Sequence, residues 1–371
     1  MDSNYRQKEI VPIVLIALVA TIAASNGFQF GKLFFPADVL SEFPPWQGID
    51  NGGPGPRNSL LRDPVVEFEP WEELVRSAFS EHHWPLWNPY SFMGSPLLGN
   101  GQNSAFTIFS IPLHFFSPIP AHFGEAFLKL CVAGMFMYWL ARTLGLGGTA
   151  SLVAGLTFML SGHMMAWLHL PLSAGVALAP LLLLGVERLL QKTTRFWFCL
   201  TAIGVAMLAL CGQPQTTFCV GLLAIAFSMY RLIHHRRREP DDASLYRRAM
   251  WLLLGMVLGT GLSAFQSLPF LEYLRQSEAA RVRDAYNVFY LPLYHLITLL
   301  LPDFFGNVVH GNYWGYSNNV GPAIYVGSLT LFLALTAVAL RKRDADTIFF
   351  GAAALICLAI MTKRFGGGQV L

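Results

Sequence analysis

Charged residues are scarce in this sequence. Of its 371 residues, 13% are Asp, Glu, Lys or Arg and 54% are hydrophobic, whereas soluble domains carry about 25% charged residues. So few charged side chains do not suit the surface of a soluble protein of this length. The composition therefore excludes an ordinary soluble domain and predicts a membrane protein with several spans.

Familiar nucleotide-binding and catalytic motifs are also missing. The sequence has no Walker loop, no Gly-x-Gly-x-x-Gly before a helix, no Gly-x-Ser-x-Gly and no His-Glu-x-x-His. These absences remove support for ATP-driven transport, dinucleotide redox chemistry and membrane zinc proteolysis. The net charge is only +3 and no basic patch is interleaved with aromatics, so we predict no nucleic-acid partner.

Cysteines are few and show no ligand spacing. They lie in hydrophobic segments, without Cys-x-x-Cys or Cys/His patterns, so we predict neither a disulfide framework nor structural zinc. We interpret them as apolar packing residues: Cys131, Cys199, Cys211, Cys219 and Cys357.

What the chain does have is a series of long hydrophobic runs. A span needs about 20 apolar residues, and this rule predicts about nine spans, of which the first is an uncleaved helix. The run Ala105 to Phe116 is too short to cross and is bracketed by prolines, so we expect a re-entrant or interfacial element. The predicted spans are Ile10–Phe30, Glu125–Arg142, Thr149–Leu168, Ser173–Leu190, Phe196–Cys211, Thr216–Leu232, Ala249–Pro269, Ala323–Leu340 and Thr347–Met361.

Basic residues cluster in alternate loops when nine spans are assumed. By the positive-inside rule these loops are cytoplasmic, which predicts a cytoplasmic N-terminus. The loops Lys32 to Gln102 and Leu271 to Pro322 then face outward, together with most of the acids, amides and aromatics. We predict a single transmembrane domain over 1–371, made of a first span (10–30), an outer catalytic loop (32–104), a helical bundle (105–270), a second outer loop (271–322) and two last spans (323–361).

The first outer loop carries its own helix. Apolar residues from Trp71 to Phe79 recur at helical spacing, which predicts an amphipathic helix over 70–81 lying along the membrane interface, with its apolar side toward lipid or the bundle. The Gly/Pro cluster at 51–56 predicts a flexible turn before it.

Carboxylates are concentrated in the same loop. Asp38 stands at the outer end of the first span, where a carboxylate loses hydration unless it is paired; it is either functional or a capping, solvated residue. Asp63, Glu67 and Glu69 follow. A general base must reach a substrate hydroxyl, and a phosphate-bearing substrate can need a divalent cation, Mg or Mn, held by carboxylates. Asp38 and one of these three acids are candidates for either role. The spacing Asp-x-x-x-Glu-x-Glu of the three is no recognised metal motif, and a solvated loop is the alternative for Glu67 and Glu69.

Two outer connections hold further polar candidates. His163 and His169 flank the outer end of a predicted span. Histidines at this place could bind a phosphate or transfer a proton, and packing is the alternative. Of the two we favour His163 as the functional residue, because it lies one turn deeper in the span. Gln213 and Gln215 flank Pro214 in a short connection. Paired amides suit sugar hydroxyls, and a tight hairpin turn is the alternative.

The second outer loop combines arginines with aromatic residues. Arg275, Arg281 and Arg283 offer planar forks for phosphate, against the usual charge distribution. Tyr313 and Trp314 offer faces that stack on sugar rings, or they belong to an ordinary aromatic girdle.

Several sequence blocks resemble the bacterial YfhO-like membrane protein family. The most specific is Pro85-Leu86-Trp87-Asn88-Pro89-Tyr90, and the similarity runs from the first span almost to the end. The other blocks are Asp38 to Trp46, Gly94-Ser95-Pro96-Leu97, Ser161-Gly162-His163, Gly212-Gln213-Pro214-Gln215, Pro302-Asp303-Phe304-Phe305-Gly306, Tyr313-Trp314-Gly315 and Tyr325-Val326-Gly327.

That family resembles the GT-C class of polytopic glycosyltransferases. The resemblance implies a GT-C-like fold in the bacterial inner membrane, with Asp38 as catalytic base or metal-associated acid and Asp63 as second candidate. It also implies a polyprenyl-phosphate-linked sugar as donor and an envelope glycan or lipid as acceptor, within membrane lipid. Trp87 and Asn88 join the substrate-binding candidates. Family members are usually longer, so we expect this chain to lack a C-terminal region.

Two other functions remain open from the sequence. One is a transporter or flippase of a lipid-linked envelope component, and the other is a structural membrane scaffold. Transporters usually place ionisable residues near the middle of their spans. Most predicted spans here carry almost none, which favours an enzyme.

Overall fold

A computed structural model of the chain describes residues 3–25, 34–47, 58–278, 291–316, 321 and 323–362. These residues are predominantly helical, and the strands among them are two antiparallel two-residue segments, β1 (Trp87–Asn88) and β2 (Ser95–Pro96). The helical content and the apolar helices confirm the prediction of an all-α membrane protein. Three residues and one segment singled out in the sequence lie outside the described residues: Lys32, Arg281, Arg283 and the turn at 51–56.

The chain divides into two compact units. The first unit comprises Met1–Met159 and Trp167–Gln276, and the second comprises Leu160–Ala166 and Ser277–Leu371. Each unit therefore contains its own candidate residues, and they are described separately.

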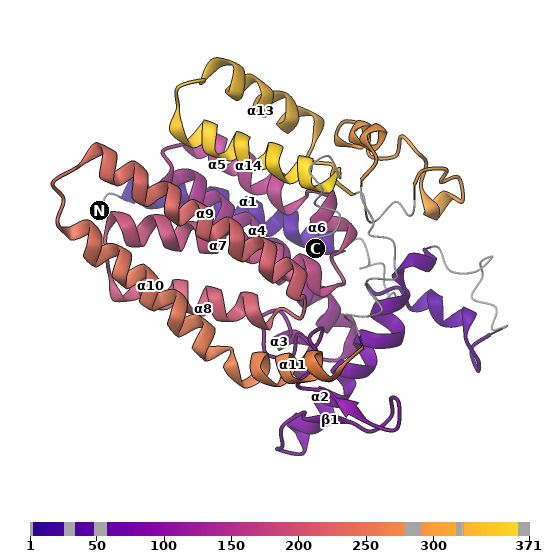
Figure 1. Ribbon diagram of the computed structural model, residues 1–371. Coiled ribbons are helices and arrows are strands. Elements are labelled where there is room, and N and C mark those ends of the chain that lie inside the picture. The colour runs from indigo at the N-terminus through magenta and orange to yellow at the C-terminus, as the bar shows by residue number, and fades with distance from the viewer. Residues whose placement is uncertain are drawn as a thin grey trace. The chain divides into compact units, whose positions relative to one another are not determined.

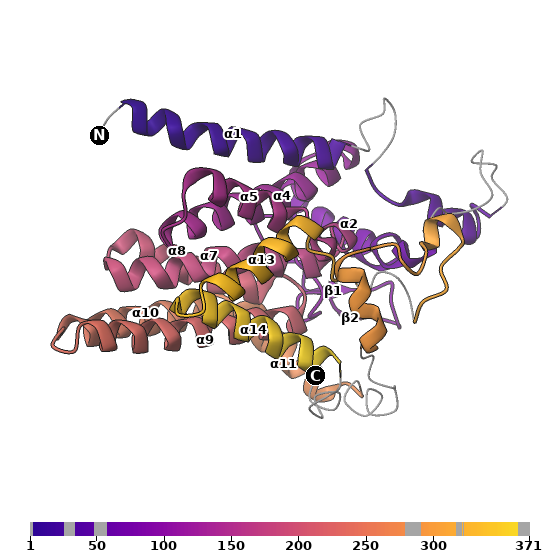
Figure 2. The ribbon, with the colours of Figure 1, turned by 90° about the horizontal axis from the view of Figure 1, so that it is seen from above.

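Long helices form the bundle of the first unit. α4 packs against α1, α5 and α7, and α7 packs against α8 and α9, so these helices lie side by side (Figures 1 and 2). α7 is apolar around its circumference and buried along most of its length, as expected for the central helix of a bundle. The helices are α1 (Ser3–Ser25), α4 (Pro118–Thr143), α5 (Gly148–Met159), α7 (Pro171–Gln191), α8 (Arg195–Leu210), α9 (Pro214–Arg238), α10 (Ser244–Leu262) and α11 (Ala264–Gln276).

Local sequence signals set where these helices begin and end. α4 ends in a Schellman motif: Gly145 takes a positive φ of 94°, and the N–H of Leu146 donates to the carbonyl of Ala141 at 3.0 Å. Oγ1 of Thr194 accepts from the N–H of Trp197 and so caps α8. α9 begins at Pro214, a residue whose missing N–H costs nothing in the first helical turn.

Four helical segments are long and apolar enough to cross a membrane: Pro118–Thr143, Gly148–Ala166, Pro171–Gln191 and Pro214–Arg238. The pair α10 and α11 adds a fifth if it counts as one span. Shorter apolar helices occupy the other predicted spans: Glu9–Ser25, Arg195–Leu210, Ser328–Leu340 and Ala345–Met361. Helices are thus present at each predicted position, while a total of nine spans stays a prediction.

The predicted span Ala249–Pro269 is bent. The chain bends by 66° between α10 and α11. Gly259, Gly261 and Ser263 stand at the end of α10, and Gly/Ser pairs are a common cause of sharp kinks. α11 then continues beyond Pro269 to Gln276.

The segment between α1 and α4 folds into short elements around a small core. Val75, Leu97 and Ala105 are buried there, with Trp71 and Phe106 packed against them. The helix predicted over 70–81 is present as α2, and its apolar side faces this core; its place at a membrane interface stays a prediction. The elements are η1 (Ala37–Glu42), η2 (Ser59–Leu61), η3 (Pro64–Phe68, a π-helix), α2 (Glu69–Ser80), β1, β2 and α3 (Ile111–Phe115).

The predicted re-entrant run Ala105 to Phe116 contains only one short helix, α3. Five residues rise about 7.5 Å, so this helix is too short to cross a bilayer. It packs against α2 and α4, which places the run against the bundle of the first unit.

The described residues of the second unit form α6, two 3-10 helices and a helical hairpin. α13 packs against α14, and the N–H of Leu291 donates to the carbonyl of Met361 at 2.8 Å. The N–H of Gly162 donates to the carbonyl of Tyr325 at 2.7 Å, which ties α6 to the segment before α13. The elements are α6 (Gly162–Ala166), η4 (Leu293–Leu299), η5 (Val308–His310), α13 (Ser328–Leu340) and α14 (Ala345–Met361).

Candidate functional site

A cluster of ionisable side chains lies where α2, α3, the first half of α4 and the loop before α7 meet. All of these elements belong to the first unit. Their sequence spacing explains the convergence, because residues three or four apart on a helix share one face. We call the following residues the charge cluster: Glu69, Glu72, Arg76, His114, His122, Glu125, Lys129 and His169.

Lys129 forms the buried centre of the charge cluster. Its side chain is 2% exposed, and its Nζ lies 2.6 Å from Oε1 of Glu125. The same nitrogen donates to the main-chain carbonyls of Leu168 and Leu170, at 2.9 and 3.2 Å. An ammonium has three donors, so this cation is satisfied entirely by protein groups and fastens the loop before α7 to α4.

Glu72 and His114 face each other beside this centre. Oε2 of Glu72 lies 3.7 Å from Nδ1 of His114, and Nε2 of His114 lies 2.7 Å from the carbonyl oxygen of Ala105. Burial, with the negative charges of Glu125 and Glu69, raises the pKa of Glu72 to about 8. Burial also lowers the pKa of His114. Glu72 is therefore mostly protonated near neutral pH, which is unusual for a carboxyl and typical of functional sites.

Glu69 is kept ionised by its neighbours. Burial alone would raise its pKa, but the contact with His122, whose Nε2 lies 3.2 Å from Oε2 of Glu69, and the charge of Arg76 outweigh burial and lower it. Glu69 and Glu72, two acids on the same face of α2, thus differ in protonation. Such a split is how one site supplies both an acid and a base.

Aromatic rings from the segment before Asp38 cover the charge cluster. The Phe35 ring stacks on His122, with centroids 4.3 Å apart, and the Phe34 ring lies 4.7 Å from that of His169. Burial, with the charges of Lys129 and His122, lowers the pKa of His169 to about 4 despite the opposing effect of Glu125. Asp38 is three residues beyond Phe35, so their Cα atoms lie within about 11 Å of each other.

The two predicted catalytic acids stand on elements that pack together. Asp38 lies in the first turn of η1, and Asp63 directly precedes η3, which contacts η1. Both nitrogens Nε and Nη2 of Arg62, which directly follows η2, donate to Oε2 of Glu42 at the end of η1. Among the described residues, no group of three or more His, Cys, Asp or Glu side chains is arranged to hold a metal ion. A cation at Asp38 and Asp63 would need further oxygen ligands from water or substrate.

Other predicted residues of the first unit lie apart from the charge cluster. Asn88 is the buried last residue of β1, where its Oδ1 accepts from the N–H of Tyr90 and its Nδ2 donates to Ser91, while Trp87 is exposed. Gln213 precedes α9 and is partly buried. The exposed candidates that remain are Gln215, in the first turn of α9, and Arg275, in the last turn of α11.

The remaining described candidates belong to the second unit. His163 lies in α6, whereas Tyr313 and Trp314 lie after η5. It is His169, and not the favoured His163, that joins the charge cluster. Tyr313 donates a hydrogen bond to the carbonyl of Tyr316 at 2.9 Å.

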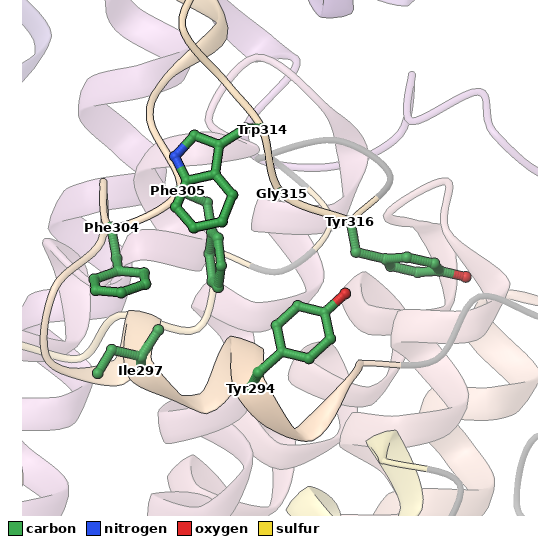
Figure 3. Close-up of a pocket in the computed structure, with 7 residues that line it drawn as sticks. All are labelled: Tyr294, Ile297, Phe304, Phe305, Trp314, Gly315 and Tyr316. Carbon is green, nitrogen blue, oxygen red and sulfur yellow. The ribbon is translucent and has the colours of Figure 1, made fainter.

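Trp314 belongs to an aromatic pocket of about 710 Å³ in the second unit (Figure 3). Its indole packs edge to face on Phe305, with centroids 4.8 Å apart. A second pocket of about 310 Å³ shares Phe305 with it; we call it the polar pocket because its otherwise largely apolar lining includes His295, Asp303 and Asn307. We call the first the aromatic pocket, lined by Tyr294, Ile297, Phe304, Phe305, Trp314, Gly315 and Tyr316.

Comparison with known proteins identifies one family. The model of the family described as bacterial membrane protein YfhO matches residues 121–363, which is more than half of the chain. The match starts in the first turn of α4 and ends just after α14, so the segment with Asp38, Asp63 and Trp87 precedes it. No curated protein and no solved structure matches the chain.

Proposed function

Because the chain belongs to the family of bacterial YfhO membrane proteins, we propose that it is a GT-C-type glycosyltransferase. It takes a sugar from a polyprenyl-phosphate-linked donor and transfers it to an envelope glycan or lipid acceptor. The single observation that carries the proposal is the charge cluster, a largely buried set of acids and bases whose His122 and His169 contact the segment that leads to Asp38.

In the proposed reaction the protein supplies one proton acceptor and stabilises the leaving phosphate. The acceptor hydroxyl attacks the anomeric carbon while the bond from that carbon to the carrier phosphate oxygen breaks. Asp38 takes the hydroxyl proton, and the bonding electrons leave with the polyprenyl phosphate. Asp63 is the second candidate for the base. If a divalent cation, Mg or Mn, takes part, these two carboxylates are the proposed ligands.

Cations and polar side chains near the outer loops complete the proposal. Arg275, Arg281 and Arg283 are proposed to bind the donor phosphate, since a guanidinium matches its oxygens in a bidentate way. Donor and acceptor contacts are proposed for Trp87, Asn88, His163, Gln213, Gln215, Tyr313 and Trp314. The site is proposed to face away from the cytoplasm of the bacterial inner membrane, with the N-terminus inside, as the charge pattern of the loops predicts.

A second candidate function is transport of a lipid-linked envelope component. Buried ion pairs within the bundle favour it: Lys129 with Glu125 in α4, and Arg231 of α9 with Glu187 of α7. Ionisable groups in spans commonly mark transport pathways. However, the partners of Lys129 are all protein groups, which suits a fixed structural role better than a moving cargo.

The proposal is tested by reconstituting the full chain in lipid vesicles with polyprenyl-phosphate sugars. Release of the carrier phosphate reports bond breaking, and movement of intact labelled donor across the bilayer reports transport. We expect Asp38→Asn to abolish release while the protein remains folded in the membrane.

Asp241→Asn is the matched control, because it removes an exposed carboxylate between α9 and α10. We expect this variant to retain the activity of the unaltered chain. Full sugar transfer by Asp38→Asn would refute the catalytic assignment. Donor movement without phosphate release would instead identify a transporter.

A further inference from the structure

The aromatic and polar pockets of the second unit lie next to each other. They share Phe305, and the second pocket adds the hydrogen-bonding side chains of His295, Asp303 and Asn307 to the rings of the first. Volumes of about 710 and about 310 Å³ fall within the range of about 300–1,000 Å³ that small-ligand sites occupy. We propose that the two pockets form one saccharide-binding site, with a sugar ring stacked on Trp314.

The rings that line the aromatic pocket pack edge to face on one another and form an aromatic platform. Phe304 and Phe305 pack edge to face at 5.0 Å, Tyr294 lies 5.7 Å from Phe305, and Trp314 completes the group. The indole of Trp314 is 67% exposed, and Figure 3 shows its ring among the others that line the pocket. An exposed aromatic face suits the C–H face of a sugar ring, because it buries apolar area without demanding hydrogen bonds.

The polar pocket provides acceptors and donors for the hydroxyl rim of the same ligand. Oδ1 of Asp303 accepts from Nδ2 of Asn307 at 3.1 Å, which leaves Oδ2 as a further acceptor. His295 is buried and stacked on Phe305, with its Nε2 accepting from the N–H of Tyr316 at 3.0 Å. Nδ1 therefore carries the proton of the neutral ring, and this buried donor has no hydrogen-bond partner among the described residues.

The loop that carries these residues is held by its own hydrogen bonds. The N–H of Trp314 donates to the carbonyl of Phe305 at 2.9 Å, and the N–H of Asn307 donates to Oδ1 of Asn312 at 2.9 Å. Both ends of the platform are thus fixed before a ligand arrives. Preorganisation of this kind lowers the entropic cost of binding.

The hydrogen-bonding side chains of the polar pocket argue against a hydrocarbon chain as occupant. A prenyl or acyl chain would fill the aromatic pocket but would desolvate Asp303 and Asn307 without replacing their hydrogen bonds, which is unfavourable. A saccharide offers a C–H face to the aromatic rings and hydroxyls to the polar side chains. That the bound sugar takes part in transfer rests on the proposed function, whereas its binding does not.

Binding is measured directly on the full chain in lipid nanodiscs, because maltoside detergents would compete as sugars. The probes are maltose, cellobiose and chitobiose, followed by saturation-transfer NMR and calorimetric titration. We expect at least one disaccharide to bind, and Trp314→Ala to weaken it about tenfold, the loss expected when one stacked ring is removed. Asp303→Leu should weaken it as well, and Trp314→Phe should retain most of the affinity.

Trp251→Ala is the matched control, because it removes a partly exposed tryptophan from α10. Its affinity should equal that of the unaltered chain. The site is refuted if no disaccharide binds, if Trp314→Ala binds as tightly as the unaltered chain, or if only sugar-free polyprenyl phosphate competes. Trp314-dependent binding without any sugar transfer would leave this site standing and refute the proposed function instead.

Discussion

Oε2 of Glu72 lies 3.7 Å from Nδ1 of His114, and neither atom has a hydrogen-bond partner among the described residues. Because Nε2 of His114 donates to Ala105, Nδ1 presents a lone pair. A protonated Glu72 would present a hydroxyl to it. The raised pKa of Glu72, about 8, and the lowered pKa of His114 therefore describe one complementary, uncharged pair inside the charge cluster.

This pair predicts a dependence of stability on pH. The folded-state pKa of Glu72 exceeds the ordinary value of 4.5, so the folded chain holds a proton that the unfolded chain releases. Its contribution is most favourable below pH 4.5 and is lost as the pH rises to about 8. Glu72→Gln should abolish this fall, on the order of a few kcal/mol, because the amide also donates to Nδ1. Denaturant titrations from about pH 5 to about pH 9 would measure it.

Glu73 provides the control for this titration. It is the next residue on α2, its side chain is 64% exposed, and it pairs with Arg76. Glu73→Gln should leave the pH dependence unchanged. If Glu72→Gln loses as much stability between pH 5 and pH 8 as the unaltered chain, the proton does not reside on Glu72.

A second prediction concerns the buried Lys129. Lys129→Met would leave Glu125 without its cation and the carbonyls of Leu168 and Leu170 without a donor. Breaking a buried pair from one side costs about 3–5 kcal/mol. We expect a loss of this size in denaturant titration of the solubilised protein. The double variant Lys129→Met/Glu125→Gln should recover part of it, and an unchanged single variant would contradict the structural role.

The helices were largely predictable from the sequence because they depend on local signals. Apolar length located each helix of the bundle, and the spacing of Trp71, Leu74 and Val75 located α2 within one residue at each end. The bend at Ser263 was not predicted, since hydropathy reports how long an apolar run is and not whether it is straight. The positions of Gly259 and Gly261 were the available signal.

The charge cluster was mostly missed because it is a tertiary feature. The local pattern favours a solvated loop for Glu69 and gives no role to His114 or His122, since nothing local shows that α2, α3 and α4 converge. One signal was available: Glu125 precedes Lys129 by four residues inside an apolar span. A pair at that spacing lies on one face of a helix. Charged residues in a span are rare and are usually paired or functional.

A third prediction uses two glycines to test the turn before α9. Gly212 has a φ of +74°, and a Cβ there would lie 2.6 Å from the carbonyl oxygen of Gln102. Gly212→Ala combines this clash with a left-handed backbone, so we expect a loss of about 2 kcal/mol or more in the free energy of unfolding. Gly221, inside α9, has nothing within 4 Å of a built Cβ. Gly221→Ala should be neutral or stabilise by up to about 1 kcal/mol, because alanine is the better helix former. Equal effects of the two substitutions in the same denaturant titration would contradict the close approach of Gly212 to the Gln102 carbonyl.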